Sequence, residues 1–307
     1  MPWLRLIRWK NLLIIFLTQL LAWWCVVVPD APFVPDVLNL QNFLLISAST
    51  LLIAAAGYII NDYFDIKTDA INKPYKVVLE TVIPRKQAII AHTALNIFAL
   101  ILAGIVAVQA HHPEWVFLQL SCTLLLWFYS TDFKRQYITG NVAISLLTAL
   151  TLLILILYEP TAHPGGMPLK YAFSDKGYVL LFYAYFAFML TWMREIVKDM
   201  EDQIGDEKTG CMTMPIKRGL QYSANFTLAL AAVVIISLVV VSLVMLRGHF
   251  WQLPLYFTLL LLIPLLIWCF RFSKRSGTNH YHTASSQLKI IMLSGICSLI
   301  IYHLEFR

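Results

Sequence analysis

Two short segments of this chain carry aspartates at the same spacing. They read DYFDIKTD at residues 62–69 and DMEDQIGD at residues 199–206, and both fit the pattern D-x-x-D-x-x-x-D without a gap. Positions three and four residues apart lie on one face of an α-helix, so each segment predicts a stripe of carboxylates. Like charges about 4 Å apart repel by roughly 1 kcal/mol in water, and by more near apolar surroundings. We therefore expect each stripe of carboxylates to bind cations.

Carboxylates in this arrangement suit Mg²⁺. Proteins hold this ion through one or two carboxylates, while water and the phosphate oxygens of a substrate fill the remaining positions. The expected ligand is a diphosphate, and two stripes that face each other could hold two or more Mg²⁺ ions around it. An EF-hand calcium loop is excluded, because its ligands stand at alternate positions around a glycine. Of the 17 acidic residues, nine lie within 61–69 and 195–207, which argues against scattered loop acids.

The similarity between the two segments continues downstream. TVIPRK at residues 81–86 is similar to TMPIKR at residues 213–218, and each contains a threonine, a proline and a basic pair. Self-similarity at two places in one chain is typical of an internal repeat. We therefore expect one domain over residues 1–307, built from pseudo-repeated halves that each carry one aspartate motif.

The elements that position these motifs are strongly apolar. The chain is 59% hydrophobic and only 13% charged, with a mean hydropathy of +0.71, whereas roughly a quarter of residues are charged in soluble proteins. A membrane helix needs about 20 mostly apolar residues, and helices satisfy their own backbone hydrogen bonds in lipid. The composition predicts an all-α integral membrane protein with nine transmembrane helices. The expected spans are 11–28, 41–60, 88–109, 115–130, 141–158, 178–194, 223–247, 252–271 and 286–304.

The distribution of Lys and Arg predicts an N-in, C-out orientation. With nine spans and a cytoplasmic N-terminus, 19 of the 23 Lys and Arg residues fall on the cytoplasmic side, as the positive-inside rule requires. Both aspartate motifs follow even-numbered spans, so both are expected at the cytoplasmic face. Topology and anionic phosphate neighbours explain the net charge of +6, and no nucleic acid partner is expected.

A diphosphate bound at the end of a lipid-embedded bundle implies an amphiphilic ligand. A polyprenyl diphosphate fits, because its anionic head suits the metal site and its apolar tail suits the space between the spans. Duplicated halves with charged motifs also occur in secondary transporters. However, a transporter is expected to place its carboxylates near mid-span, and these aspartates stand at span ends. The pattern favours catalysis on a membrane-dissolved substrate, with transport as an alternative.

The aspartate motifs resemble those of a known family. Asn61 and the segment 62–69 match the N-D-x-x-D-x-x-x-D motif of the UbiA superfamily of intramembrane prenyltransferases, and the segment 199–206 matches its second aspartate motif. YSTDFK at residues 129–134 resembles the Y-x-x-x-x-K element of the family, and a G-N pair follows at residues 140–141. The resemblance covers nearly the whole chain. It implies nine helices around a central cavity that opens laterally toward lipid.

The resemblance also implies roles for individual residues. The metal ligands for two or more Mg²⁺ ions would be Asn61, Asp62, Asp65, Asp69, Asp199, Asp202 and Asp206. The catalytic residues would be Asp62, Asp65, Asp199, Asp202, Tyr129 and Lys134, and the substrate-binding residues Asn61, Lys73, Tyr129, Lys134, Arg194 and Lys198. The implied reaction is Mg²⁺-dependent transfer of a prenyl group to a membrane-associated acceptor.

Two segments favour one acceptor class. REIVKDMEDQIGDEKTG at residues 194–210 and INKPYK at residues 71–76 resemble the branch of the family that alkylates geranylgeranylglyceryl phosphate. The chain departs from the family pattern at residues 77–86, where VVLETVIPRK replaces the usual P-[IL]-x-S-G-x continuation. An aromatic acceptor on a quinone or pigment route stays the alternative, followed by cyclisation of the prenyl diphosphate without an acceptor.

Overall fold

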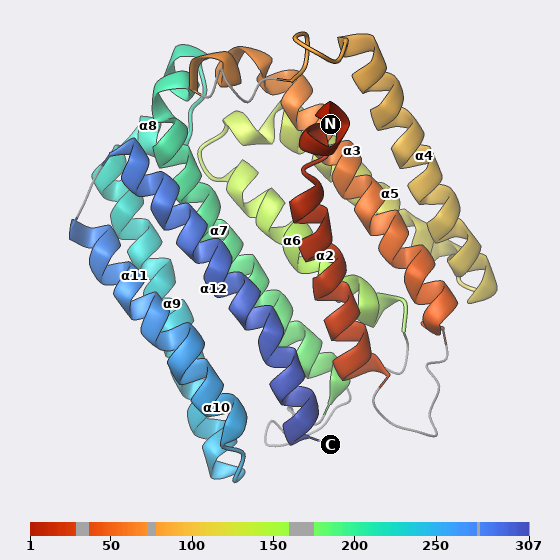
Figure 1. Cartoon of the computed structure of the whole chain (residues 1–307), viewed down its shortest axis with the longest axis vertical. Helices are drawn as coiled ribbons and strands as arrows, with labels where there is room; N and C mark the ends of the chain where they lie inside the picture. The colour runs from red at the N-terminus through yellow and green to blue at the C-terminus, as the bar shows by residue number, and fades with distance from the viewer. Residues whose placement is uncertain (29–36, 73–77, 160–174, 275–276, 307) are drawn as a thin grey trace.

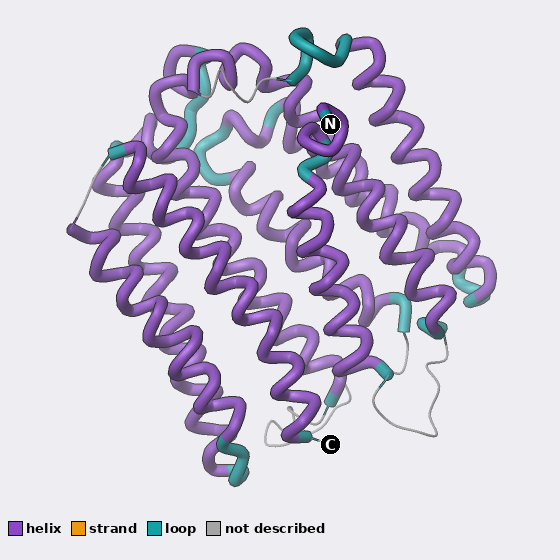
Figure 2. Tube along the Cα trace, in the orientation of Figure 1, coloured by secondary structure: helices purple, strands orange, loops and turns teal. Residues whose placement is uncertain are grey.

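The chain folds as a bundle of long helices that run side by side (Figure 1). The computed structural model describes residues 1–28, 37–72, 78–159, 175–274 and 277–306. Within these ranges the only β-type pairing is an isolated bridge between Leu79 and Ile83, and almost everything else is helix (Figure 2). The expected all-α class is therefore confirmed.

The helices have the following bounds. The long ones are α2 (Trp9–Ala22), α3 (Leu40–Asn72), α4 (Arg85–Gln109), α5 (Val116–Thr131), α6 (Thr139–Leu157), α7 (Lys176–Lys208), α9 (Leu220–Arg247), α11 (Ile263–Lys274) and α12 (Thr278–Glu305). The short ones are α1 (Pro2–Leu6), α8 (Met214–Arg218), α10 (Gln252–Phe257), the 3₁₀ turns η3 (Pro113–Trp115) and η4 (Phe133–Arg135), and the π-helical segments η1 (Trp23–Val27) and η7 (Thr258–Leu262).

Eight helical segments of the described chain are long and apolar enough to cross a membrane. They correspond to eight of the nine expected spans, with α10, η7 and α11 joined into one segment, Gln252–Lys274. The remaining expected span, 115–130, forms α5, which has 16 residues, fewer than the roughly 20 of a full crossing. The predicted count of nine is therefore not confirmed by length and composition.

The helices α3 and α7 are the longest, with 33 residues each. At 1.5 Å per residue they are about 50 Å long, whereas the hydrocarbon core is about 30 Å thick. Each helix continues roughly 13 residues past the ~20 of one crossing, and the aspartate motifs occupy these last turns. Both ends lie at the upper end of the bundle in Figure 1, beside the N-terminus. The motifs are thus helical and share one end, as expected.

Small residues allow the helices that carry the site to pack closely. Ala99, Ala103 and Ala107 follow one face of α4 at intervals of four, and all three are fully buried. The helix α4 packs against α3 along this face, where the hydroxyl of Ser49 donates to the carbonyl of Ala99 at 2.8 Å. Helices in lipid associate through such small-residue faces, because van der Waals contact replaces the hydrophobic effect. The helix α7 is similarly enclosed by α3, α6, α9 and α12.

Two carboxylates at the opposite end of the bundle bind backbone N–H groups. The fully buried Glu159 accepts from the N–H groups of Val37 and Leu38 at 3.0 and 2.8 Å, just before α3. Glu305 accepts from the N–H groups of residues 251–253 at 2.6–2.8 Å, at the start of α10. Helix N-termini carry unpaired N–H groups and attract negative charge. Glu305 therefore stabilises the start of α10, Glu159 holds the turn that leads into α3, and neither acid belongs to the aspartate site.

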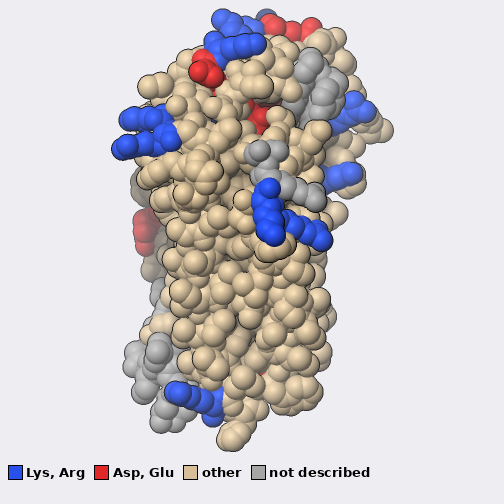
Figure 3. Space-filling model, turned by 90° about the vertical axis from the view of Figure 1, so that its left-hand side faces the viewer, with Lys and Arg blue, Asp and Glu red and all other residues tan. Residues whose placement is uncertain are grey.

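The outer surface is mostly uncharged. Lys and Arg gather toward the upper end and at the lower tip of the face in Figure 3, and the lower half between them is almost entirely tan. Exposed apolar side chains such as Phe98, Ile236 and Ile290 line the long helices. Exposed apolar side chains on largely uncharged helix surfaces are typical of a surface in contact with lipid.

Candidate active site

One cavity of about 1130 Å³ lies within the bundle. It exceeds the roughly 300–1,000 Å³ of ordinary ligand pockets, so it has room for a large ligand or for two. The structure brings eleven of the twelve predicted site residues to its wall. They are Asn61, Asp62, Asp65, Asp69, Tyr129, Lys134, Arg194, Lys198, Asp199, Asp202 and Asp206. The twelfth, Lys73, and the rest of the INKPYK segment from it onward lie outside the described residues.

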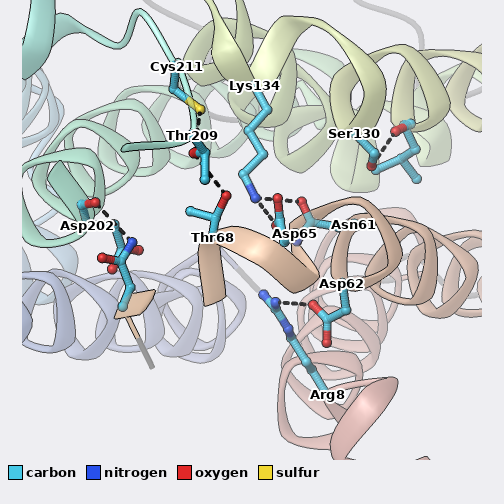
Figure 4. A network of polar contacts seen from close by, with 12 residues as sticks. Arg8, Asn61, Asp62, Asp65, Thr68, Ser130, Lys134, Asp202, Thr209 and Cys211 are labelled. Carbon is cyan, nitrogen blue, oxygen red and sulfur yellow. Dashed lines mark hydrogen bonds and ion pairs between the residues drawn. The ribbon is translucent and has the colours of Figure 1, made fainter. Parts of the chain in front are cut away.

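Asp65 is the centre of the first motif. Its Oδ2 accepts one hydrogen bond from the Lys134 ammonium and another from the Asn61 amide at 2.8 Å. The Lys134 Nζ also donates to the side-chain oxygen Oδ1 of Asn61 at 3.3 Å. Figure 4 shows the three side chains converging from α3 and η4. Asn61 and Asp65 are one helical turn apart, which is why they can share a partner.

The position of Lys134 depends on a close contact with α6. A Cβ on Gly140 would lie 2.6 Å from the Phe133 carbonyl oxygen and 2.8 Å from the Lys134 Cα, both backbone atoms. Only glycine fits this contact. Burial acts to lower the pKa of Lys134, whereas the carboxylates around it, Asp206 foremost, act to raise it. The net direction is down, because the half-buried ammonium loses solvation.

Asp62 faces the N-terminal segment. Its Oδ1 accepts from the Arg8 guanidinium at 2.7 Å (Figure 4). Arg8 lies between α1 and α2 with a φ of 50°, and its guanidinium also stands over the Tyr58 ring at 5.0 Å. This left-handed conformation is costly for a side chain with a Cβ, so the ion pair and the ring contact together explain how it is held. The kink directs Arg8 into the cavity.

The second motif is tied to α6. The Asn141 amide donates to Asp199 Oδ2 at 2.9 Å. Asn141 is one residue after Gly140, so the G-N pair holds Asp199 through one member and Lys134 through the other. The second motif also provides Asp206, which is almost fully buried at 8% exposure. Its burial near Lys134 explains why its charge acts so strongly on that ammonium.

A side-chain clasp joins the ends of α3 and α7. The Asn72 side-chain amide donates to the backbone carbonyl oxygen of Asp202 at 2.9 Å. The backbone N–H of Gly205 donates to Asn72 Oδ1, also at 2.9 Å. A Cβ on Gly205 would come within 2.4–2.5 Å of the Asn72 amide group. Thr68 adds a second link, because its hydroxyl donates to the Thr209 hydroxyl at 3.1 Å (Figure 4). These contacts fix the distance between the two aspartate motifs.

Arg194 and Lys198 lie on α7 just before the second motif, five residues and one residue ahead of Asp199. Both donate to Glu195 Oε1, at 3.0 and 2.7 Å. The three side chains are 12–30% exposed. One carboxylate therefore balances two cations at this point of the cavity wall.

The donor set fits Mg²⁺ chemistry with few protein ligands per ion. It consists of carboxylate and amide oxygens, which are the ligands that hard divalent cations prefer. Within the described ranges, no three acidic, His or Cys side chains stand close enough together to hold a metal ion. Asp62 and Asp65 are turned toward Arg8 and Lys134 instead. Magnesium bound through one or two carboxylates and substrate phosphates needs no such cluster of three.

Three residues of the site were not predicted from the sequence. Arg8 was counted only as a positive-inside charge, and its approach to Asp62 has no signal in the sequence. Asn141 was noted within the G-N pair but received no role, although the pair itself was the available signal. Asn72 stands in the INKPYK element, which served only to indicate the acceptor class, whereas in the structure it joins two helices.

Comparison with known proteins agrees with the motif assignment. A model of the UbiA prenyltransferase family matches residues 20–290. A digeranylgeranylglyceryl phosphate synthase of Methanothermobacter thermautotrophicus is 33% identical over 186 residues, which are 59% of this chain and 58% of that relative. The enzyme of the same name from Saccharolobus solfataricus is 29% identical over 270 residues, 88% of this chain and 87% of that relative. These names belong to the branch that residues 194–210 resemble.

Solved structures share the fold. One from work on digeranylgeranylglyceryl phosphate synthase in membranes has a TM-score of 0.66 at 24% identity, covering 99% of this chain and 98% of that one. A UbiA homolog from Archaeoglobus fulgidus bound to GPP and Mg²⁺ has a TM-score of 0.64 at 17% identity, covering 98% and 100%. With its apolar spans, the chain is an integral, multi-pass membrane protein. The match over residues 20–290 shows that it belongs to the UbiA prenyltransferase family.

Proposed function

We propose that this protein transfers a prenyl group from a polyprenyl diphosphate to the hydroxyl of a geranylgeranylglyceryl phosphate-like acceptor. The observation that carries the proposal is the meeting of both aspartate motifs with Lys134 at the polar end of one large, mostly apolar cavity. The relatives named digeranylgeranylglyceryl phosphate synthase supply the acceptor class. The A. fulgidus homolog bound to GPP and Mg²⁺ supports a prenyl diphosphate donor and a divalent metal.

The metal and the diphosphate belong at the aspartate end. Asp62, Asp65, Asp69, Asp199, Asp202, Asp206 and the Asn61 carbonyl would hold two or more Mg²⁺ ions. Magnesium supplies Lewis-acid stabilisation of the diphosphate as the allylic C–O bond breaks. Lys134 and Tyr129 would bind the phosphate oxygens as donors, and Lys73 is proposed from the sequence motif alone. Before the donor arrives, Asp62 is paired with Arg8 and Asp65 with Lys134.

The apolar part of the cavity is suited to the rest of the reaction. Below the first motif, Gly57, Ala54 and Ile53 on α3 face Leu126 and Cys122 on α5 across the cavity wall. This surface would take the donor chain. An apolar wall excludes water, so the allylic cation would be captured by the acceptor hydroxyl instead of by water, and the hydroxyl proton would pass to the departing pyrophosphate.

We also propose that α5 crosses the membrane as a ninth span, with the N-terminus and the active site cytoplasmic. The two termini lie at opposite ends of the bundle (Figure 1), which an odd number of crossings requires. The distribution of Lys and Arg supports the orientation. Single cysteines introduced at Lys86 and at Arg247 should be labelled by an impermeant maleimide from opposite sides of sealed vesicles. Labelling of both from one side would contradict the topology.

An acceptor screen tests the proposed reaction. Protein in lipid nanodiscs should convert labelled geranylgeranyl diphosphate and geranylgeranylglyceryl phosphate into an ether product and pyrophosphate, detected by mass spectrometry, and EDTA should stop both. The variants Asp65→Asn and Asp202→Asn should be slower by about 10²-fold or more, because an electrostatic ligand of the leaving group is lost. Glu207→Gln is the matched control, since Glu207 is an exposed acid on the same helix end outside the cavity wall. Metal-independent turnover, or product only with aromatic acceptors, would contradict the proposal.

A further inference from the structure

The cavity has a second charged region, away from the first aspartate motif. It is formed by Lys10 and Asn11 on α2, Arg194 and Lys198 on α7, and Lys289 on α12, all of which line the cavity. The helices α2 and α12 contact each other, as do α12 and α7. The Lys289 ammonium donates to the side-chain oxygen Oδ1 of Asn11 at 2.7 Å, so it is held by a neutral group.

This region has an excess of positive charge. Arg194 and Lys198 share a single carboxylate oxygen of Glu195. The charges that act on Lys289 are those of Arg194 and Lys10, both of the same sign. By contrast, the carboxylates of Asp206, Asp62 and Asp202 act on Lys134. Like charges repel more strongly in low-dielectric surroundings than in water, so this cluster is incomplete without an anion.

Unused hydrogen-bond donors point to the same ligand. The Thr191 hydroxyl is buried, in a side chain that is 4% exposed, and has no hydrogen-bond partner within the described chain. The Arg194 Nε, one helical turn away, is also buried without an acceptor among the described residues. A buried polar group without a partner costs free energy, and both residues line the cavity. An oxyanion at this point would accept from both.

The apolar surface below the cluster suits a hydrocarbon chain. From Arg194 toward the far end of the bundle, Leu190, Phe186 and Phe182 follow the cavity face of α7 at intervals of four. From Lys289, Met292 and Ile296 follow the corresponding face of α12. Side chains at these spacings lie on one face of a helix. The surface therefore offers an anion-binding head and an apolar groove, separate from the α3 and α5 wall assigned to the donor.

We propose that Arg194, Lys289 and Lys10, with the Thr191 hydroxyl, bind the phosphate monoester of the acceptor. This inference rests on the proposed function and assigns Arg194 to the acceptor in place of the donor diphosphate. A phosphate monoester carries a charge of about −1.5 to −2 at neutral pH and three acceptor oxygens, which matches the charge excess and the unused donors. The subsite would select glyceryl phosphate acceptors over uncharged alcohols and would hold the glycerol hydroxyl facing the aspartate end.

Binding without metal tests the subsite apart from catalysis. Full-length protein in phosphatidylcholine nanodiscs with EDTA should bind geranylgeranylglyceryl phosphate at least tenfold more tightly than geranylgeranylglycerol, which lacks the phosphate. Lys289→Gln should remove most of this difference, and Lys289→Arg should retain it, because charge-assisted hydrogen bonds are worth roughly tenfold or more each. Thr191→Val should bind geranylgeranylglyceryl phosphate about threefold or more weakly. The substitution removes no hydrogen bond described in the folded protein, so it should not affect folding. Lys86→Gln, an exposed cation outside the cavity, is the matched control.

Kinetics and competition separate the possible failures. Lys289→Gln should raise the KM for the acceptor about tenfold and leave the KM for the donor within twofold. Equal binding of the two ligands by the wild type, or unchanged acceptor binding in both Lys289→Gln and Thr191→Val, would overturn the subsite. So would displacement of the acceptor by phosphatidic acid at equal concentration, which would identify a membrane-lipid headgroup site. If the binding results hold but no ether product forms, the proposed reaction fails and the phosphate subsite stands.

Discussion

The clasp between Asn72 and Gly205 gives a sharp test of how the two aspartate motifs are held together. In Gly205→Ala, the added Cβ would stand 2.4–2.5 Å from the Asn72 amide, so that side chain must leave its position. Two hydrogen bonds of 2.9 Å are then lost, which costs about 1–3 kcal/mol at roughly 0.5–1.5 kcal/mol each. Alanine is about 1 kcal/mol better than glycine within a helix. The net loss of stability is therefore about 0–2 kcal/mol.

The effect on the reaction should be larger than the effect on stability. The clasp connects the residue three positions after Asp69 with the residue before Asp206, so its loss lets the two motifs separate. A displacement near 1 Å can cost about 10²-fold in rate. We expect Gly205→Ala to lower the rate of pyrophosphate release about 10- to 100-fold, with a melting temperature within a few degrees of the wild type. Thermal unfolding in detergent and a continuous pyrophosphate assay measure the two quantities.

A double substitution decides whether the contact is the cause. Asn72→Ala loses the same two hydrogen bonds without any clash, so it should be slower than the wild type by a similar factor. Once residue 72 is alanine, the Cβ at position 205 has room, and Asn72→Ala/Gly205→Ala should be no slower than Asn72→Ala alone. Contacting residues are expected to be non-additive in this way. If the two rate losses multiply, the clash with Asn72 does not explain the effect, and the reasoning is refuted.

Two further substitutions test other contacts. Gly140→Ala should lower the rate of prenyl transfer at least tenfold with the protein still folded, because its Cβ would displace the backbone at Phe133 and Lys134; Gly104→Ala, whose Cβ would meet only a side-chain methyl at 3.8 Å, is the control. If Gly140→Ala reacted with wild-type kinetics, the position of the Lys134 turn would have no effect on the reaction. Glu305→Gln should lower the melting temperature by several degrees and leave prenyl transfer at 25 °C unchanged. It weakens three backbone hydrogen bonds far from the site, together worth about 1.5–4.5 kcal/mol at roughly 0.5–1.5 kcal/mol each. An unchanged melting temperature would show that this helix start needs no carboxylate.

Local patterns in the sequence were sufficient for eight of the nine expected membrane spans and for the aspartate stripes. Apolar runs of about 20 residues predict helices in lipid because no other open-ended structure satisfies the backbone there. The spacing of 62–69 and 199–206 places carboxylates on one helix face through helical geometry alone. The motifs are in fact the last turns of α3 and α7, which continue as helix past the apolar runs. The short span at 115–130 was the weakest prediction, and its helix α5 has only 16 residues.

Residue types and spacing by themselves determined that this is a membrane protein with two acidic helix faces and an oxygen donor set suited to Mg²⁺ and a diphosphate. The tertiary structure decided which groups meet those acids. Arg8 reaches Asp62 across 54 positions of sequence, Lys134 reaches Asp65 across 69, and Asn72 reaches Gly205 across 133. The same packing brings Lys10, Arg194 and Lys289 to one wall of the cavity. Contacts between distant residues depend on how helices pack, and helix periodicity carries no information about the partner that a given face will meet.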